Sequence, residues 1–112
     1  MQRRYLIQAA AAVALAPSMA RAQSPWPSKP IRIVVPFTPG GTTDFVTRLV
    51  ATELARSLGQ PVMIENKPGA GTVIGVDNVA KSAPDGSSFV TVANSFTVNQ
   101  TLVKKLPYDG LK

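Results

Sequence analysis

The feature that most constrains this chain is a β-branched run that ends in paired glycines and continues as a helix. Ile31–Val35 is almost continuously apolar, which is typical of a parallel strand covered on both faces. Two prolines and two glycines follow within Pro36–Gly41, and a helical pattern starts at Thr42–Asp44. This order predicts an α/β fold in which a glycine turn leads from the sheet into a helix N-terminus.

The same order recurs further along the chain. A second strand leads into a second glycine-rich turn and helix, and a third strand leads into a polar loop. The predicted elements are strands at Ile31–Val35, Pro61–Glu65 and Ser88–Ala93, and helices at Thr43–Leu58, Thr72–Ser82 and Val98–Lys105. A βαβαβ order predicts a parallel sheet with right-handed crossovers.

The first helix has apolar residues at helical spacing, which predicts one buried stripe formed by Val46, Leu49, Val50, Leu54 and Leu58. Thr42 or Thr43 is expected to cap its N-terminus and Gly59 to end it. Asp44 lies in the first turn, where a carboxylate interacts favourably with the helix dipole.

Composition excludes several chemistries. The chain has no Cys and no His, so it offers no thiol nucleophile, no thiolate or imidazole metal site and no Ser-His-Asp triad. Its carboxylates are scattered, so we expect no metal and no cofactor. The formal charge of +6 includes Arg3, Arg4 and Arg21, without which it falls to +3. The remaining basic residues form no stripe, so we expect no nucleic-acid partner.

Residues 1–22 resemble an export signal. Arg3 and Arg4 precede an apolar stretch at Tyr5–Ala16, and Ala20-Arg21-Ala22 supplies the small residues of a cleavage site before Gln23. The stretch is shorter than the roughly 20 apolar residues of a membrane span. We therefore expect a periplasmic protein that does not itself span the membrane; ordinary secretion and twin-arginine export both remain open.

The glycine turns suggest a site for an anion. The first N–H groups of a helix lack internal partners, the helix dipole favours negative charge there, and glycine lets a ligand approach the backbone. A tight turn without a ligand is the alternative for either turn alone. Both turns, and the polar loop Asn94–Thr97, follow strand ends that share one edge of a parallel sheet, where ligands of open α/β sheets bind.

Several motifs, in order, resemble the Bug-type solute receptors of tripartite tricarboxylate transporters, and the resemblance covers nearly the whole chain after residue 22. The motifs are Pro27–Arg32, Val35-Pro36-Phe37, Pro39–Asp44, Leu58–Val62, Glu65–Gly71, Ala80–Gly86 and Leu106–Asp109. One departure is Thr72-Val73, where members often carry a further glycine.

The resemblance implies a two-lobed, type II-like periplasmic binding protein that closes on a small carboxylate. It implies main-chain amides and waters as the groups that hold the ligand, and three loops that line the cleft. The candidate substrate-binding residues are Phe37, Thr38, Gly40, Gly41, Thr42, Thr43, Asp44, Asn66, Pro68, Gly69, Ala70, Gly71, Thr72, Asn94, Ser95 and Phe96.

A family member is roughly three times as long, so residues 23–112 are expected to be part of the first lobe, in a fragment, a truncated product or an interrupted reading frame. The expected function is capture of a small carboxylate for the membrane permease subunits of a transporter, without enzymatic activity. The alternatives are an exported acyl-transfer hydrolase with Gly40-Gly41 as oxyanion hole, nucleotide binding at Gly69–Gly71, and ligand presentation to a sensor kinase. The hydrolase would lack the G-x-S-x-G motif.

Overall fold

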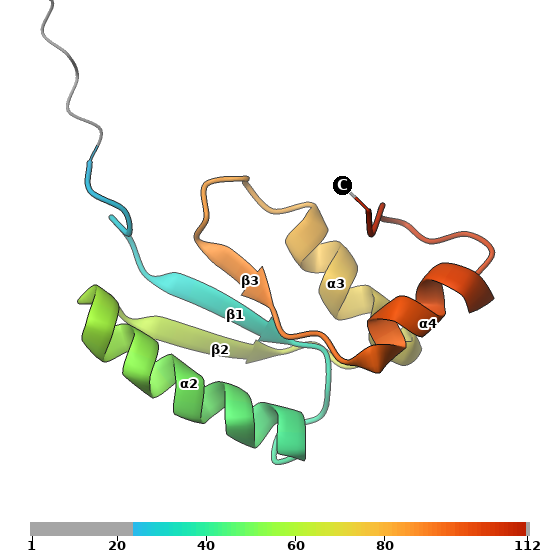
Figure 1. Cartoon of the computed structure of the whole chain (residues 1–112), viewed down its shortest axis with the longest axis horizontal. Helices are drawn as coiled ribbons and strands as arrows, with labels where there is room; N and C mark the ends of the chain where they lie inside the picture. The colour runs from blue at the N-terminus through green and yellow to red at the C-terminus, as the bar shows by residue number, and fades with distance from the viewer. Residues whose placement is uncertain (1–23, 112) are drawn as a thin grey trace, which may run out of the picture.

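The computed structural model describes residues 24–111, in which three strands form one parallel sheet with α2 and α3 packed against it (Figure 1). β1 (Ile31–Val35) is the central strand, between β2 (Val62–Asn66) and β3 (Ser88–Val90). Both neighbours pair with it in parallel. The predicted α/β class is confirmed; the predicted export signal, 1–22, lies outside the described residues.

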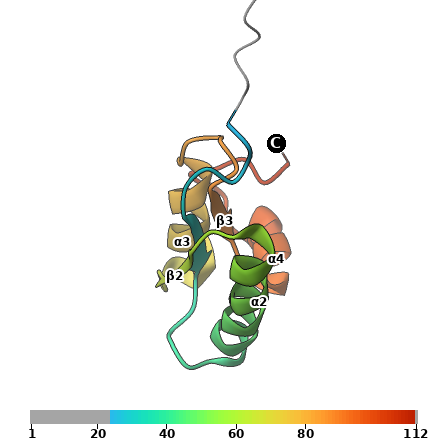
Figure 2. The ribbon, with the colours of Figure 1, turned by 90° about the vertical axis from the view of Figure 1, so that its left-hand side faces the viewer.

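Side chains of β1 alternate between two helices. Ile31 and Ile33 pack with Ala51 of α2 (Thr42–Leu58), and Leu54 and Leu58 close the cluster from the same helix. On the other face, the guanidinium of Arg32 donates a hydrogen bond to Asn78 of α3 (Val73–Ala80). Figure 2 shows α2 and α3 on opposite sides of the strands. The period-two alternation of a strand therefore places one helix on each face.

The predicted apolar stripe of α2 is partly wrong. Leu54 and Leu58 pack against the sheet as expected, but the residues that are buried nearer the helix N-terminus are Thr47 and Ala51. Val46, Leu49 and Val50 are about half exposed, at 50%, 56% and 51%. The spacing of these three apolar residues identified one face of the helix, but the described part of the chain leaves that face about half exposed.

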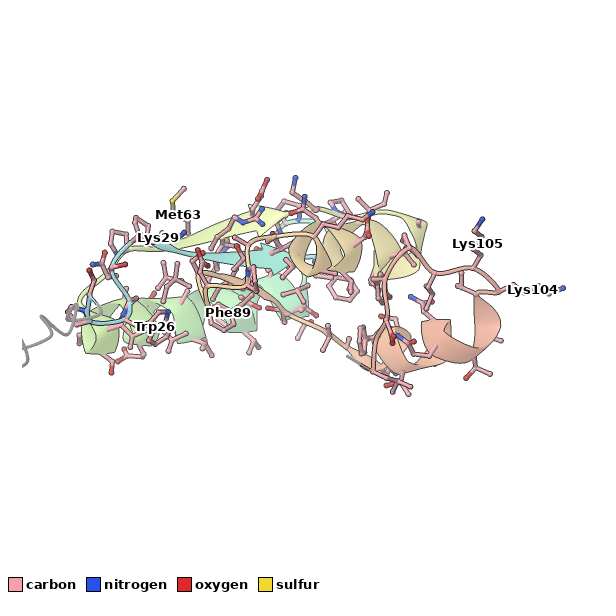
Figure 3. All side chains as sticks on the ribbon, turned by 90° about the horizontal axis from the view of Figure 1, so that it is seen from above. Trp26, Lys29, Met63, Phe89, Lys104 and Lys105 are labelled. Atoms are coloured by element: carbon pink, nitrogen blue, oxygen red, sulfur yellow. The ribbon has the colours of Figure 1, made fainter. Side chains whose placement is uncertain are left out.

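A groove of about 590 Å³ runs along that side of the molecule, between α2 and the α2-facing side of the sheet. Its apolar walls include Trp26, Ile33, Val50 and Phe89. Figure 3 shows Trp26 and Phe89 on the same side of the strands as α2, and Met63 pointing away on the other. None of the candidate binding residues lines this groove.

Two elements differ from the sequence prediction near the third strand. β3 ends at Val90 instead of Ala93. Thr91 N–H still bonds to Val34 O (2.9 Å), but β1 ends at Val35, so residues 92 and 93 have no further length of β1 to pair with. α4 spans Asn94–Leu102, so the predicted polar loop Asn94–Thr97 is its first turn. Within residues 24–111, no helix has both the length and the apolarity needed to cross a bilayer.

α3 approaches the end of β1 very closely. After the 3-10 turn η1 (Ala70–Thr72), α3 places Gly75 against the chain that leaves β1. A Cβ at Gly75 would lie 2.6 Å from Pro36 Cβ and 3.1 Å from both Pro36 Cα and Lys67 O. A glycine is therefore required here by space, since the backbone conformation itself is an ordinary helical one.

Gly75→Ala is expected to destabilise the chain by roughly 1–3 kcal/mol, the usual cost of overpacking a core. Urea unfolding followed by circular dichroism measures the change. Gly41→Ala is the matched control, because its Cβ would meet only Thr38 O at 3.7 Å. Equal stability of the two variants would contradict the close contact between α3 and Pro36.

Candidate functional site

The two glycine turns lie at the same edge of the sheet. β1 and β2 run in parallel with Val35 opposite Asn66, so the turns that follow them emerge side by side. Lys67 N–H donates to Val35 O (2.9 Å), which extends the pairing into the second turn. In Figure 1 the arrowheads of all three strands point towards this edge, where α4 also lies.

The first turn presents the start of α2. Gly40 adopts φ +86°, which favours glycine, and Gly41 occupies the N-cap position. The prediction that Thr42 or Thr43 caps the helix is wrong, because the N-cap is Gly41 and makes no side-chain capping bond. The amides of the first helical turn, Gly41 to Thr43, lack partners within the helix by construction, and this segment is mainly exposed.

The side chain of Asp44 hydrogen-bonds to the first turn and to the residues that flank it. Its carboxylate is buried, with the residue 3% exposed. Oδ2 accepts hydrogen bonds from Gly40 N–H (3.0 Å) and Arg48 Nε (2.9 Å). Oδ1 accepts one from Asn66 Nδ2 (2.9 Å). The carboxylate thus reaches back to Gly40, the residue before the N-cap, which is one residue further than the acidic side chain of a capping box reaches.

Asn66 connects the first turn to the end of β2. Its Nδ2 donates to Phe37 O (3.1 Å) as well as to Asp44, and its Oδ1 accepts from Arg48 Nη2 (3.2 Å). The turn is therefore fastened at its beginning, through Phe37, and near its tip, through Gly40.

Hydrogen bonds hold the pKa of Asp44 well below its usual range. The bond from Arg48 has the largest effect, followed by those from Gly40 and Asn66. These donors stabilise the charged form more than burial opposes it. Arg48 lies one helical turn after Asp44, and its side chain remains 52% exposed. The pair leaves this corner of the site close to electrically neutral.

The second turn has an unusual backbone. Four successive residues have positive φ: Gly69 (132°), Ala70 (47°), Gly71 (61°) and Thr72 (82°). The left-handed region is unfavourable for Ala and Thr, and such strain is concentrated at functional sites. Thr72 N–H is satisfied internally by Gly69 O at 3.0 Å, so this amide is engaged within the turn.

Side chains of α4 hold the second turn in place. Asn99 Nδ2 donates to Gly71 O (2.7 Å) and approaches Thr72 Oγ1 (3.4 Å). Ser95 Oγ lies 3.4 Å from the same Thr72 hydroxyl, which is buried. Phe96 stacks on Tyr108 with ring centroids 6.1 Å apart. The third predicted segment is thus a helix start attached to the second turn.

The candidate residues fall into two contacting groups. Residues of the first turn meet Asn66, and residues of the second turn meet Ser95 of α4. Most of the turn backbone is exposed, whereas Asp44 and Thr72 are buried. The exposed candidates are Thr38, Gly40, Gly41, Thr42, Pro68, Gly69, Ala70, Gly71 and Asn94; Phe37, Thr43, Asn66, Ser95 and Phe96 are intermediate.

Sequence reasoning missed two residues that touch these turns. Arg48 stands four residues after Asp44, the spacing of a helical ion pair, so the signal was present. Asn99 reaches Gly71 from 28 residues away, and no local pattern indicates such a contact. Among residues 24–111, no group of three or more acidic side chains is placed to hold a metal ion.

A parallel sheet whose helix-opening glycine turns share the carboxyl edge is typical of α/β ligand-binding proteins. Comparison with known families is more specific. Residues 46–112 match the tripartite tricarboxylate transporter family receptor, TctC, and the chain belongs to this family. Its members are solute-binding receptors rather than enzymes, so the prediction of a non-enzymatic protein is confirmed, as is the Bug-type resemblance.

Solved structures agree with this membership. The chain is 40% identical to the periplasmic binding protein BugD (TM-score 0.72, covering 75% of this chain and 28% of that one). It is 35% identical to Rpa4515 of R. palustris, solved with adipate (TM-score 0.73; 78% and 29%). It is 46% identical to MatC of Rhodopseudomonas palustris, solved with bound malate (TM-score 0.56; 58% and 22%).

Among curated proteins, BugT of Bordetella pertussis is 45% identical over 89 residues, which are 78% of this chain and 27% of BugT. The chain therefore spans less than a third of the length of this relative.

The Asp44 hydrogen bonds predict a specific pH dependence. Because its pKa is depressed in the folded state, its contribution to stability is present above the unfolded pKa of about 3.9 and is lost as pH falls towards the folded value. Urea unfolding between about pH 5 and pH 3 should show the wild-type chain losing stability more steeply than Asp44→Asn.

Asp85, whose pKa is also lowered by its bonds with Lys29 and Ser87, contributes to the same acid range from the opposite end of the sheet. Asp85→Asn is the matched control, because it should also make the loss of stability with acid less steep without altering the first turn. The double variant should lose the stability contributions of both carboxylates. Identical slopes for the wild type and Asp44→Asn would contradict the depressed pKa of Asp44.

Proposed function

We propose that this chain carries part of the ligand site of a periplasmic receptor that captures a small dicarboxylate for a transporter. The observation that carries the proposal is the pair of glycine turns at one sheet edge, with the first helical amides of α2 at an exposed position. Relatives of the same fold have been solved with malate and with adipate. The shared chemistry of those ligands is an aliphatic chain that ends in carboxylates.

The charges near the turns favour backbone recognition. Arg48 pairs with Asp44 (2.9 Å) and Lys67 pairs with Glu65 (2.9 Å). Because both cations already face a carboxylate, the attraction for a ligand anion falls mainly to the amides of Gly41–Thr43 and of the second turn. Neutral donors at helix starts bind carboxylates without an arginine clamp.

The size of the chain sets the expected affinity. We propose that residues 23–112 form part of the first of two lobes, and that the second lobe closes over the ligand. Binding pockets bury about 70–90% of a ligand's surface, and a single sheet edge offers roughly half of such contacts. The permease subunits of the transporter are the proposed membrane partners, and the segment at residues 1–22 is the proposed export signal.

Titration of the whole chain with sodium adipate, followed by amide chemical shifts in heteronuclear NMR, tests this function. We expect saturable shifts in the millimolar range at Gly41–Thr43 and at Gly69–Gly71. Hexanediol, which has the same carbon chain without carboxylates, is the matched ligand control and should leave these amides unmoved. Malate should shift the same amides.

Two results would count against the proposal. Unmoved glycine-turn amides at tens of millimolar adipate would remove the ligand site from this edge. A micromolar dissociation constant would instead show that the contacts present here suffice, and would contradict the need for a second lobe.

A further inference from the structure

We propose that Asp44, Asn66 and Arg48 are positioning residues that shape the first turn for the ligand without touching it. This inference rests on the proposed function, because it concerns the same amides. It also changes the role of two candidate residues: Asp44 and Asn66 become the support of the site instead of its contact surface.

The polar side-chain atoms of Asp44 and Asn66 already form hydrogen bonds within the protein. Both carboxylate oxygens of Asp44 accept hydrogen bonds, from Gly40, Arg48 and Asn66. The side-chain amide nitrogen of Asn66 carries two hydrogens and donates both, one to Phe37 O and one to Asp44 Oδ1. A ligand carboxylate needs donors, and ionised Asp44 has none to give.

These hydrogen bonds are attached at the two ends of one short segment of the first turn. Asn66 holds Phe37, the first residue after the buried Pro36, and Asp44 holds Gly40, just before the helix. The short segment between them is thus fixed at both ends. A loop fixed in this way presents Gly41–Thr43 in one orientation and avoids the ordering cost that a mobile loop incurs on binding.

Arg48 offsets the negative charge that Asp44 places near the proposed anion site. A buried anion beneath an anion site would repel the ligand if it stood alone. Arg48 Nε, 2.9 Å from Asp44 Oδ2, supplies the opposite charge, and its Nη2 also reaches Asn66 Oδ1. Asp44 can therefore fix the conformation of the turn through its hydrogen bond with Gly40, while Arg48 neutralises its charge next to the ligand.

The test uses the whole chain with Asn66→Ala and Asp44→Ala, and Asp44→Asn as the conservative variant that keeps an acceptor for Gly40. Glu53→Gln is the control, since Glu53 also pairs with an arginine of α2 (Arg56, 2.8 Å) but lies far along the helix. Without ligand, we expect faster hydrogen exchange at Gly40 in Asp44→Ala and increased backbone mobility at Thr38–Gly40 in both alanine variants. Asp44→Asn should be intermediate and Glu53→Gln unchanged.

With ligand, the initial slope of the amide shifts against concentration measures relative affinity. We expect Asn66→Ala to weaken binding of adipate and of malate by the same factor, about three- to tenfold, the value of one or two lost hydrogen bonds. Arg48→Gln should weaken both as well, and the loss should shrink at high salt, because it leaves Asp44 unneutralised.

Each outcome has a distinct meaning. A changed ratio of adipate to malate affinity in Asn66→Ala would show direct contact and overturn the positioning role. An ordered first turn in both alanine variants would overturn it too. A wild-type chain with an ordered turn that binds neither acid would overturn the proposed function, while the exchange and mobility data still decide whether these residues shape the turn. Should Asp44→Ala fail to fold, Asn66→Ala and Asp44→Asn carry the test.

Discussion

Parallel pairing of β1 with both of its neighbours is the constraint on which the rest of the structure depends. Since β2 and β3 run in the direction of β1, each strand delivers its outgoing loop to the same edge. The chain must then return along the sheet, and α2 and α3 provide the return on opposite faces (Figures 1 and 2). The candidate site is a direct consequence of this geometry, because within the described residues 24–111 both helix-opening glycine turns leave the sheet at this one edge.

The site joins two kinds of backbone control. At the first turn, a buried carboxylate with three hydrogen-bond donors dictates the path of the chain. At the second, the chain carries positive φ through four residues, and Asn99 of α4 bonds to its carbonyl at Gly71. Thr72 accepts an unfavourable backbone conformation, with φ 82°, and buries a side chain that meets Ser95. Both turns are held by hydrogen bonds from other segments of the chain, which is the kind of support that preorganised recognition requires.

The sequence predicted the order of elements, the parallel sheet and the two glycine turns because these follow from local patterns: β-branched runs, helical spacing and glycine. It predicted less well where contacts between distant segments decide the outcome. Val46, Leu49 and Val50 have the spacing of a buried stripe, yet Thr47 and Ala51 are buried instead. The start of α4 at Asn94 was missed because polar Asn94–Thr97 resembles a loop. The double role of Asn66, at Phe37 and Asp44, depends on strand register and has no local signal.

The central claim is that amides from both turns hold one carboxylate together. Intermolecular nuclear Overhauser effects between the methylene protons of adipate and the backbone amides of the chain measure this directly. The account predicts contacts from the methylene next to a carboxylate to amides of both turns, at Gly41–Thr43 and at Gly69–Gly71. Contacts confined to one turn, or to Trp26 and Phe89 in the apolar groove, would contradict it.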